Sequence, residues 1–167
     1  MALDKFTGTI ADIEGVDFGA AAEADFKAQC LAALADVAYT RSIGRLQLKK
    51  TTFELNQAAA SYTLLTGTTQ DVLIESVTVR NLTDMTGGGC TSFSVHTNDT
   101  TSQVFIADTD AVKANLTVGY QFSFTGATIL KATKLIQVTI NGAASGGTDV
   151  MDIVVTYRPI VEGGYLV

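Results

Sequence analysis

Hydrophobic and polar residues alternate along most of the chain, and the alternation is clearest near its carboxyl end. Two runs, 128–140 and 149–158, place apolar residues at every second position over most of their length. A loop of Asn, Gly, Ala and Ser at 141–148 separates them. Because successive side chains of a strand point to opposite faces, a period of two predicts strands. We expect the two runs to pair as an antiparallel hairpin.

The same alternation predicts further strands earlier in the chain. They lie at 45–55, 61–66, 71–81, 90–98, 103–107 and 119–125. No strand is followed by a helical segment of crossover length, which disfavours a parallel sheet. About eight antiparallel strands of this size usually fold as two packed sheets. The predicted fold class is therefore mainly β, an antiparallel β-sandwich.

Some positions break the simple alternation. Leu48 and Phe53 are five positions apart and cannot share one face of a strand unless a bulge lies within 49–52. A similar irregularity is predicted near 131–134. Gly126 is expected in a connection between strands. Pro159 is expected to end the last strand, because proline cannot donate a hydrogen bond to the sheet.

The amino-terminal part of the chain follows a different pattern. Residues 1–18 show neither period, which predicts an extended arm. Residues 19–39 are rich in alanine, and apolar side chains at helical spacing predict an amphipathic helix. This helix either packs on its own sandwich or mediates oligomerisation around a symmetry axis. The chain is thus divided into an arm and helix, 1–43, and a sandwich domain, 44–167.

Charge is concentrated in the arm and the beginning of the predicted helix. Residues 1–26 contain six acidic residues and one lysine, a net charge of −5 out of −6 for the 167 residues. The sparse Lys and Arg residues argue against direct nucleic-acid binding. Every apolar run is too short to span a membrane, and the amino terminus lacks a secretory signal pattern. We therefore expect a protein made in a cytoplasm, with no membrane partner.

Few residues suggest chemistry. The only histidine, His96, shares a strand face with Ser94 and precedes Asp99. Side chains two apart on a strand lie about 7 Å apart, so a Ser-His-Asp relay is disfavoured and a polar, solvent-facing row is preferred. Asp108 and Asp110 could join Asp99 at a calcium ion, but the calcium-loop pattern is absent, which favours solvated carboxylates. No catalytic, cofactor-binding or metal-ligating residue is predicted.

Gly87, Gly88 and Gly89 form a triplet without the Lys and Ser or Thr of a phosphate-binding loop. The triplet therefore predicts a flexible connector or a contact loop. Cys30 and Cys90 lie far apart in different kinds of segment, which favours buried free thiols over a disulfide.

The carboxyl-terminal pattern carries a resemblance. The pattern consists of the strand Lys134-Leu135-Ile136-Gln137-Val138-Thr139-Ile140, a small-residue loop, and the run from Asp149 to Tyr157 closing on Arg158-Pro159. It resembles the final hairpin of small β-sandwich structural proteins of tailed bacteriophages. The strand at 71–81 is similar to their central strand. The resemblance implies a jelly-roll-like, non-enzymatic virion protein. Decoration or cement proteins of this kind are commonly trimeric and bind the major capsid protein or another virion protein.

Alternatives remain at this point. A tail-fibre or baseplate component fits the same resemblance, and a carbohydrate-binding module using the loops around Gly87 and Asn141 belongs to a different functional class. An enzyme has the weakest support, and no cofactor is expected.

The acidic arm has few core-forming residues, so we expect it to gain order on a neighbouring subunit or on the capsid. The residues expected to make oligomer or partner contacts are Phe6, Ile10, Ile13, Phe18, Phe26, Cys30, Leu34, Val37, Gly87, Gly88, Gly89 and Asn141.

Overall fold

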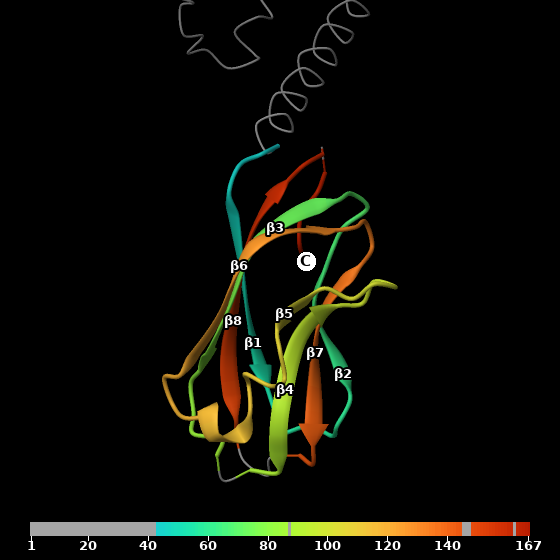
Figure 1. Cartoon of the computed structure of the whole chain (residues 1–167). Helices are drawn as coiled ribbons and strands as arrows, with labels where there is room; N and C mark the ends of the chain where they lie inside the picture. The colour runs from blue at the N-terminus through green and yellow to red at the C-terminus, as the bar shows by residue number, and fades with distance from the viewer. Residues whose placement is uncertain (1–42, 87, 145–147, 162) are drawn as a thin grey trace, which may run out of the picture. The chain divides into compact units, whose positions relative to one another are not determined.

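The computed structural model describes residues 43–86, 88–144, 148–161 and 163–167. These residues form strands and one short 3-10 helix (Figure 1). In chain order the elements are β1 (Gln47–Glu54), β2 (Ser61–Thr66), β3 (Val72–Asn81), β4 (Cys90–Thr97), β5 (Val104–Ile106), η2 (Lys113–Asn115), β6 (Gln121–Leu130), β7 (Leu135–Gly142) and β8 (Val150–Pro159). The prediction of a mainly β protein is confirmed, and Pro159 ends the last strand as expected.

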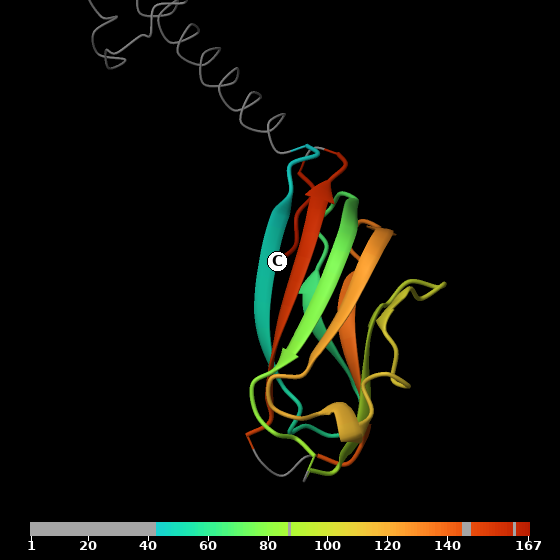
Figure 2. The same cartoon turned by 60° about the vertical axis from the view of Figure 1, so that its left-hand side comes forward.

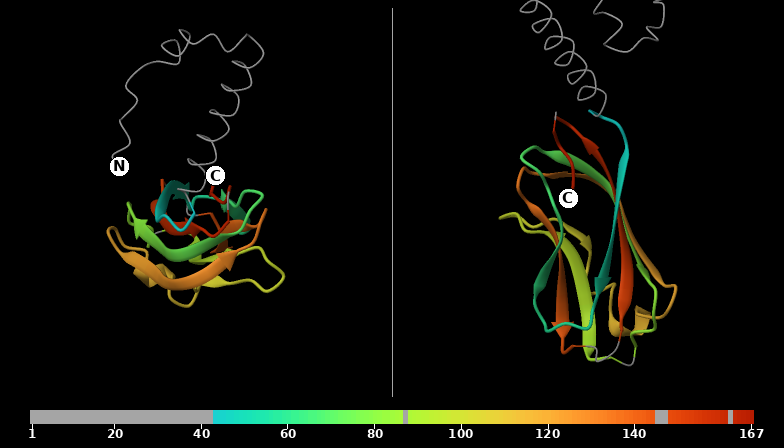
Figure 3. Two further views of the ribbon diagram at one scale, coloured as in Figure 1. Left: turned by 90° about the horizontal axis from the view of Figure 1, so that it is seen from above. Right: turned by 180° about the vertical axis from the view of Figure 1, so that it is seen from behind.

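The strands form two four-stranded sheets with the orders β1-β8-β3-β6 and β2-β7-β4-β5. We call the first sheet A and the second sheet B. All neighbouring strands are antiparallel, and the two sheets face one another (Figures 2 and 3). The first and last strands lie side by side, and consecutive strands mostly alternate between the sheets. This order is that of a double-sheet jelly roll.

The predicted hairpin of the last two strands is wrong. β7 pairs with β2 and β4 in sheet B, whereas β8 pairs with β1 and β3 in sheet A. The connection between them crosses from one sheet to the other. Both strands have one buried face, so their alternation identifies each as a strand but does not determine its partner.

The bulge predicted within 49–52 is absent. β1 pairs with β8 in unbroken register from Gln47 opposite Tyr157 to Glu54 opposite Val150. Leu48 points away from the core and is 64% exposed, whereas the next strand residues alternate regularly. No bulge is needed, because Leu48 is not a core residue.

The irregularities of β6 also differ from the prediction. Gly126 lies inside this strand, at a bulge where the register with β3 shifts between Ile74 and Ser76. A Cβ atom on Gly126 would lie 2.6 Å from the ring of Phe124, so a larger residue at this bulge would require the ring to move. The predicted strand run at 128–140 is not continuous, because β6 ends at Leu130 and β7 begins at Leu135 in the other sheet. The irregularity predicted near 131–134 is the turn between these two strands, in which Thr133 has a φ of 64°.

The core lies between the two sheets. Its aliphatic residues come from the inward faces of both, and Phe93 meets Phe122 edge to face at 5.4 Å between ring centroids. Phe105 and Phe124 form a similar pair at 5.1 Å between β5 and β6. Cys90 is buried and free, as predicted. Burial raises the pKa of its thiol, which keeps it in the unreactive protonated form.

Several predictions lie outside the described residues: the arm at 1–18, the helix at 19–39, Cys30 and the other contact residues of the first 42 positions, and Gly87. Within the described ranges, no helix is long and apolar enough to span a membrane.

Candidate interaction surfaces

Exposed apolar side chains gather at one end of the sandwich, where β1 begins and β8 ends. Twelve large hydrophobic residues of the described chain are exposed. Seven of them belong to this end, which we call the apolar end: Ile43, Leu46, Leu48, Ile160, Val161, Tyr165 and Val167. An exposed concentration of apolar side chains of this kind is typical of an interaction surface.

Hydrogen bonds hold the chain rigidly at the apolar end. The amide of Gly44 donates to the carbonyl of Pro159 at 2.7 Å, and Arg158 donates from Nη1 to the Gly44 carbonyl at 2.6 Å. The carboxyl-terminal segment extends sheet B, because Thr66 and Val167 exchange two backbone hydrogen bonds of 2.9 Å. The exposed side chains therefore project from fixed backbone positions.

The apolar end also carries uncompensated positive charge. Arg45 is exposed, and neither Arg45 nor Lys49 forms an ion pair with another described residue. Arg158 is neutralised by Glu75, whose carboxylate lies 2.7 Å from its Nε. A partner with both apolar and acidic residues would match this surface.

An open pocket of about 420 Å³ lies beside Tyr165. Its lining residues are Thr66, Gly67, Thr68, Thr69, Thr133, Gly163 and Tyr165. The hydroxyl of Thr68 is engaged, since it donates to the carbonyl of Gly163 at 2.8 Å and accepts from the amide of Tyr165 at 3.1 Å. This pocket belongs to the apolar end.

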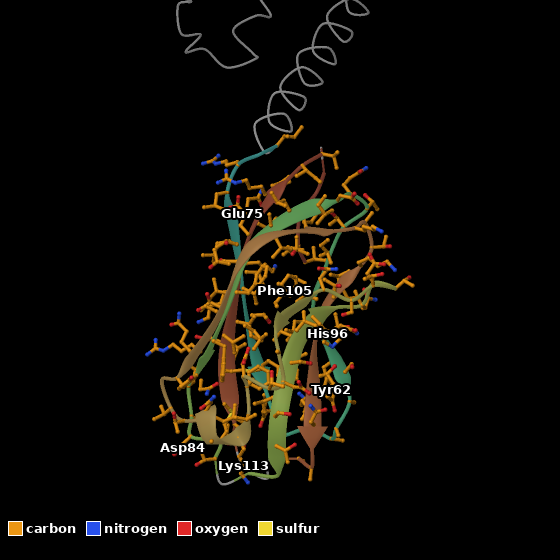
Figure 4. The ribbon with its side chains drawn as sticks, in the orientation of Figure 1. Tyr62, Glu75, Asp84, His96, Phe105 and Lys113 are labelled. Atoms are coloured by element: carbon orange, nitrogen blue, oxygen red, sulfur yellow. The ribbon has the colours of Figure 1, made fainter. Side chains whose placement is uncertain are left out.

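His96 lies on the outer face of sheet B (Figure 4). Its Nδ1 is 3.0 Å from the carbonyl of Thr97, and its Nε2 is 2.7 Å from the hydroxyl of Thr139. Because a carbonyl only accepts, Nδ1 carries a hydrogen and donates to Thr97; in the neutral form of the ring, Nε2 then accepts from Thr139. The Ser61 hydroxyl, 2.6 Å from that of Thr139, then donates to it. This row links β2, β7 and β4.

The predicted polar row is thus present, but His96 bonds Thr139 and not Ser94 or Asp99. Asp99 lies between Lys131 and Lys134, at 3.6 and 3.7 Å from their Nζ atoms. The amide of Thr100 is the main cause of a lowered pKa for this carboxyl. Among the described residues, no three His, Cys, Asp or Glu side chains gather where they could hold a metal ion.

Two loops predicted to make contacts lie together at the end opposite the apolar end. The amide of Ala143 donates to the carbonyl of Gly89 at 3.1 Å. Gly142 has a φ of 93°, and a Cβ atom there would lie 2.6 Å from the Gly89 carbonyl oxygen. Asn141 donates to the Ser92 hydroxyl at 2.9 Å. The contact role of these loops stays a prediction.

The carbonyl of Gly88 is also engaged, because the Nζ of Lys113 donates to it at 2.5 Å. Lys113 belongs to η2, so this bond ties the glycine-rich loop to the connection that precedes β6. The predicted flexible loop is anchored at this position.

A second open pocket, of about 480 Å³, lies between the β4–β5 connection and β6. Its lining residues are Asp99, Thr100, Thr101, Gln103, Ala127, Thr128, Ile129 and Lys131. The sequence does not reveal this pocket, since its threonines are indistinguishable from the many other threonines of the chain until the fold brings the two segments together.

Comparisons with known proteins complete the description. No protein-family model matches this sequence, and no characterised protein shows detectable sequence similarity to it. Among solved structures, a chain of the capsid of Helicobacter pylori bacteriophage KHP30 has a TM-score of 0.49 and 14% identity, over 75% of this chain and 94% of that chain. A chain of the cyanophage Pam1 capsid has a TM-score of 0.48 and 11% identity, over 69% and 84% of the two chains.

The metallopeptidase IMPa is also similar, with a TM-score of 0.35 and 14% identity, over 68% of this chain and 13% of that chain. At such identities and TM-scores these comparisons transfer no function. The jelly-roll assignment rests on the strand order of the two sheets.

Proposed function

We propose that this protein is a non-enzymatic structural component of a virus particle, a decoration or cement protein that binds a phage head as an oligomer. The observation that carries the proposal is the apolar end, with seven exposed hydrophobic residues on a fixed framework. The sequence resemblance to phage structural proteins supports it. So does the jelly roll, which is common in capsid domains, although fold alone does not decide function.

Exposing this apolar surface to water costs free energy. Removing apolar area from water drives most protein association, and an assembly protein can keep such a surface because its partners cover it. In this proposal the apolar end is the contact with neighbouring subunits or with the capsid protein. The arm and helix of a neighbouring subunit provide the matching segment, since the acidic residues within 1–26 complement Arg45 and Lys49.

One substitution pair tests the oligomer contact. Leu48 and Val118 are both 64% exposed, but Val118 lies outside the apolar end. We expect the wild-type chain to be an oligomer, with a trimer favoured, in light scattering after gel filtration. Leu48→Ser shifts it toward the monomer, and Val118→Ser leaves it unchanged. A monomeric wild type, or equal behaviour of the two variants, contradicts the contact.

A second experiment tests the location of the protein. Particles purified from a lysate in which this gene is expressed during infection are separated into heads and tails and analysed by peptide mass spectrometry. We expect peptides of the chain in the head fraction. Peptides confined to tails support a fibre or baseplate component instead, and their absence from all particles removes the virion role.

The non-enzymatic part of the proposal has its own test. A panel of hydrolase substrates is assayed with the wild type and with His96→Ala, because His96 is the only histidine. We expect no turnover by either protein. An activity lost in His96→Ala contradicts the proposal.

A further inference from the structure

We propose that the pocket between the β4–β5 connection and β6 binds a neutral saccharide, one pyranose unit of a glycan or polysaccharide. We call it the β4–β6 pocket, with the lining residues given above. It lies at the opposite end of β4 from the Gly89 and Asn141 loops, so it is not the carbohydrate site considered in the sequence. The proposal does not depend on a virion role.

The wall formed by the β4–β5 connection is held in place before any ligand binds. Asn98 and Leu135 form two hydrogen bonds, from the Asn98 amide to the Leu135 carbonyl at 3.1 Å and from the Leu135 amide to Asn98 Oδ1 at 2.7 Å. Thr97 and Gln103 exchange bonds of 2.9 and 3.0 Å, and Ser102 donates to the Thr97 carbonyl at 2.7 Å. The connection extends outward from the sandwich (Figure 2), yet both of its ends are fixed, which lowers the entropic cost of binding.

The polar groups of the β4–β6 pocket are available to a ligand. Four of its polar side chains form no hydrogen bond with another described residue: Thr100, Thr101, Gln103 and Thr128. On the outer faces of the sheets hydroxyls instead bond one another, as Ser76 bonds Thr156 at 2.6 Å. Threonine hydroxyls and the glutamine amide each donate and accept. Sugar hydroxyls also do both, so the two sets match.

The charged groups of the pocket favour a neutral ligand. The charged residues that line it are Asp99 and Lys131, with 3.6 Å between the carboxylate and Nζ, so their charges compensate one another. Lys134, 3.7 Å from the same carboxylate, is not among the lining residues. One Asp99 oxygen is held by the Thr100 amide at 2.7 Å. The carboxylate still has lone pairs for a ligand hydroxyl, because ionised carboxylates accept at up to about four positions.

Apolar surface completes the pocket. Ile129 is 54% exposed, and Ala127 is exposed two residues before it on β6. These side chains can cover the C–H face of a pyranose while the hydroxyls and the amide bond its edges. The volume of about 480 Å³ lies within the range of roughly 300 to 1,000 Å³ found for small-molecule sites.

Nuclear magnetic resonance titration of the full chain tests the proposal. The probes are four methyl glycosides, those of α-mannose, β-galactose, β-glucose and N-acetyl-β-glucosamine. We expect at least one to shift the amide resonances of Thr100, Thr101, Gln103 and Ile129 with a millimolar dissociation constant. No saturable shift at these amides with any of the four, or shifts confined to another surface, overturns the proposal.

Substitutions then locate the binding. Thr128→Val removes a pocket hydroxyl, and Thr125→Val is the matched control on the same strand, exposed and outside the pocket. We expect Thr128→Val to weaken binding about fivefold, the effect of losing one hydrogen bond, and Gln103→Leu to do the same. Thr125→Val binds like the wild type. Equal affinity of all three variants overturns the site, and the dispersion of their spectra verifies folding.

Discussion

Arg158 and Glu75 form an ion pair with 2.7 Å between Nε and Oε1. The same guanidinium donates from Nη1 to the carbonyl of Gly44. Because Arg158 lies on β8 and Glu75 on the adjacent β3, one side chain links two strands of sheet A to the segment that enters β1. The pair therefore positions Ile43 and its neighbours at the apolar end. Figure 4 marks Glu75 on this part of the sheet.

Removing the guanidinium should loosen this end. We expect Arg158→Met to lower the free energy of unfolding by about 1 kcal/mol, the upper range for a partly exposed pair. Glu75→Gln should cost less, since Arg158 keeps its bond to Gly44. Urea denaturation measures both values. Lys131→Met is the control, because its 3.6 Å contact with Asp99 is loose and exposed. If Arg158→Met and this control lose equal stability, the linking role is wrong.

Backbone conformation gives a second prediction. Thr133 has a φ of 64°, a region that costs a β-branched residue roughly 1 to 3 kcal/mol. Thr133→Asn should therefore raise the melting temperature, since asparagine adopts this region more readily. Gly119 has a φ of 78° and no atom within 4 Å of a Cβ position, so Gly119→Ala should destabilise through φ alone, by about 1 kcal/mol. We expect Thr133→Asn to raise the melting temperature and Gly119→Ala to lower it. If both variants shift the melting temperature in the same direction, the explanation by backbone conformation is wrong.

Asp152 predicts a specific response to acid. Its carboxylate accepts from Lys50 at 2.6 Å and from the Thr52 hydroxyl at 2.9 Å. The Lys50 bond is the main cause of a pKa below the ordinary 3.8. A carboxyl with a lowered folded pKa stabilises the fold above its unfolded pKa and loses that contribution as the pH falls through the folded value.

We therefore expect the unfolding free energy of the wild type to decrease as the pH falls below 3.8, and that of Asp152→Asn to decrease less steeply. Urea denaturation at a series of pH values measures the slopes. Asp84 has a pKa lowered mainly by the amide of Thr86, so Asp84→Asn should also flatten the curve. Parallel curves for wild type and both variants contradict this origin of acid sensitivity.

The hydroxyl row on sheet B gives a fourth prediction. Thr139→Val removes the bonds to His96 and Ser61 together. We expect a loss of roughly 1 to 2 kcal/mol in unfolding free energy, since two modest bonds disappear. Thr63→Val on β2 is the matched control, because the Thr63 side chain has no hydrogen bond with the described residues. A loss as large in the control shows that the row is not stabilising.

Much of the fold can be predicted from the alternation of the chain. Strands such as β7 and β8 have one buried face, so their apolar positions repeat at every second residue. Strand pairing cannot be predicted in this way, because the hydrophobic period shows which face of a strand is buried and not which strand lies beside it. The expected hairpin of β7 and β8 fails for this reason, whereas the jelly-roll order agrees with what the phage resemblance implies.

The surfaces are harder to predict. Leu48 is the residue that predicts a bulge in β1, if a leucine in a strand is assumed to be buried. Its 64% exposure is instead the most direct sign of the apolar end. The β4–β6 pocket depends on Thr101, in the connection between two strands of sheet B, and on Thr128, on β6 of sheet A. Only the packing of the two sheets places the two residues in one pocket.

The adjacency of β1 and β8 also governs how the protein can be made. Gln47 pairs with Tyr157, so the first strand of sheet A finds its partner only after nearly the whole sandwich has been synthesised. A nascent chain ending before Val150 leaves both β1 and β3 without the strand that lies between them. Long-range pairing of this kind is slow, because distant segments must meet before burial compensates the lost chain entropy. Folding of the sandwich is therefore expected to wait until β8 has left the ribosome, and until then the unpaired strands of the nascent chain are targets for chaperones.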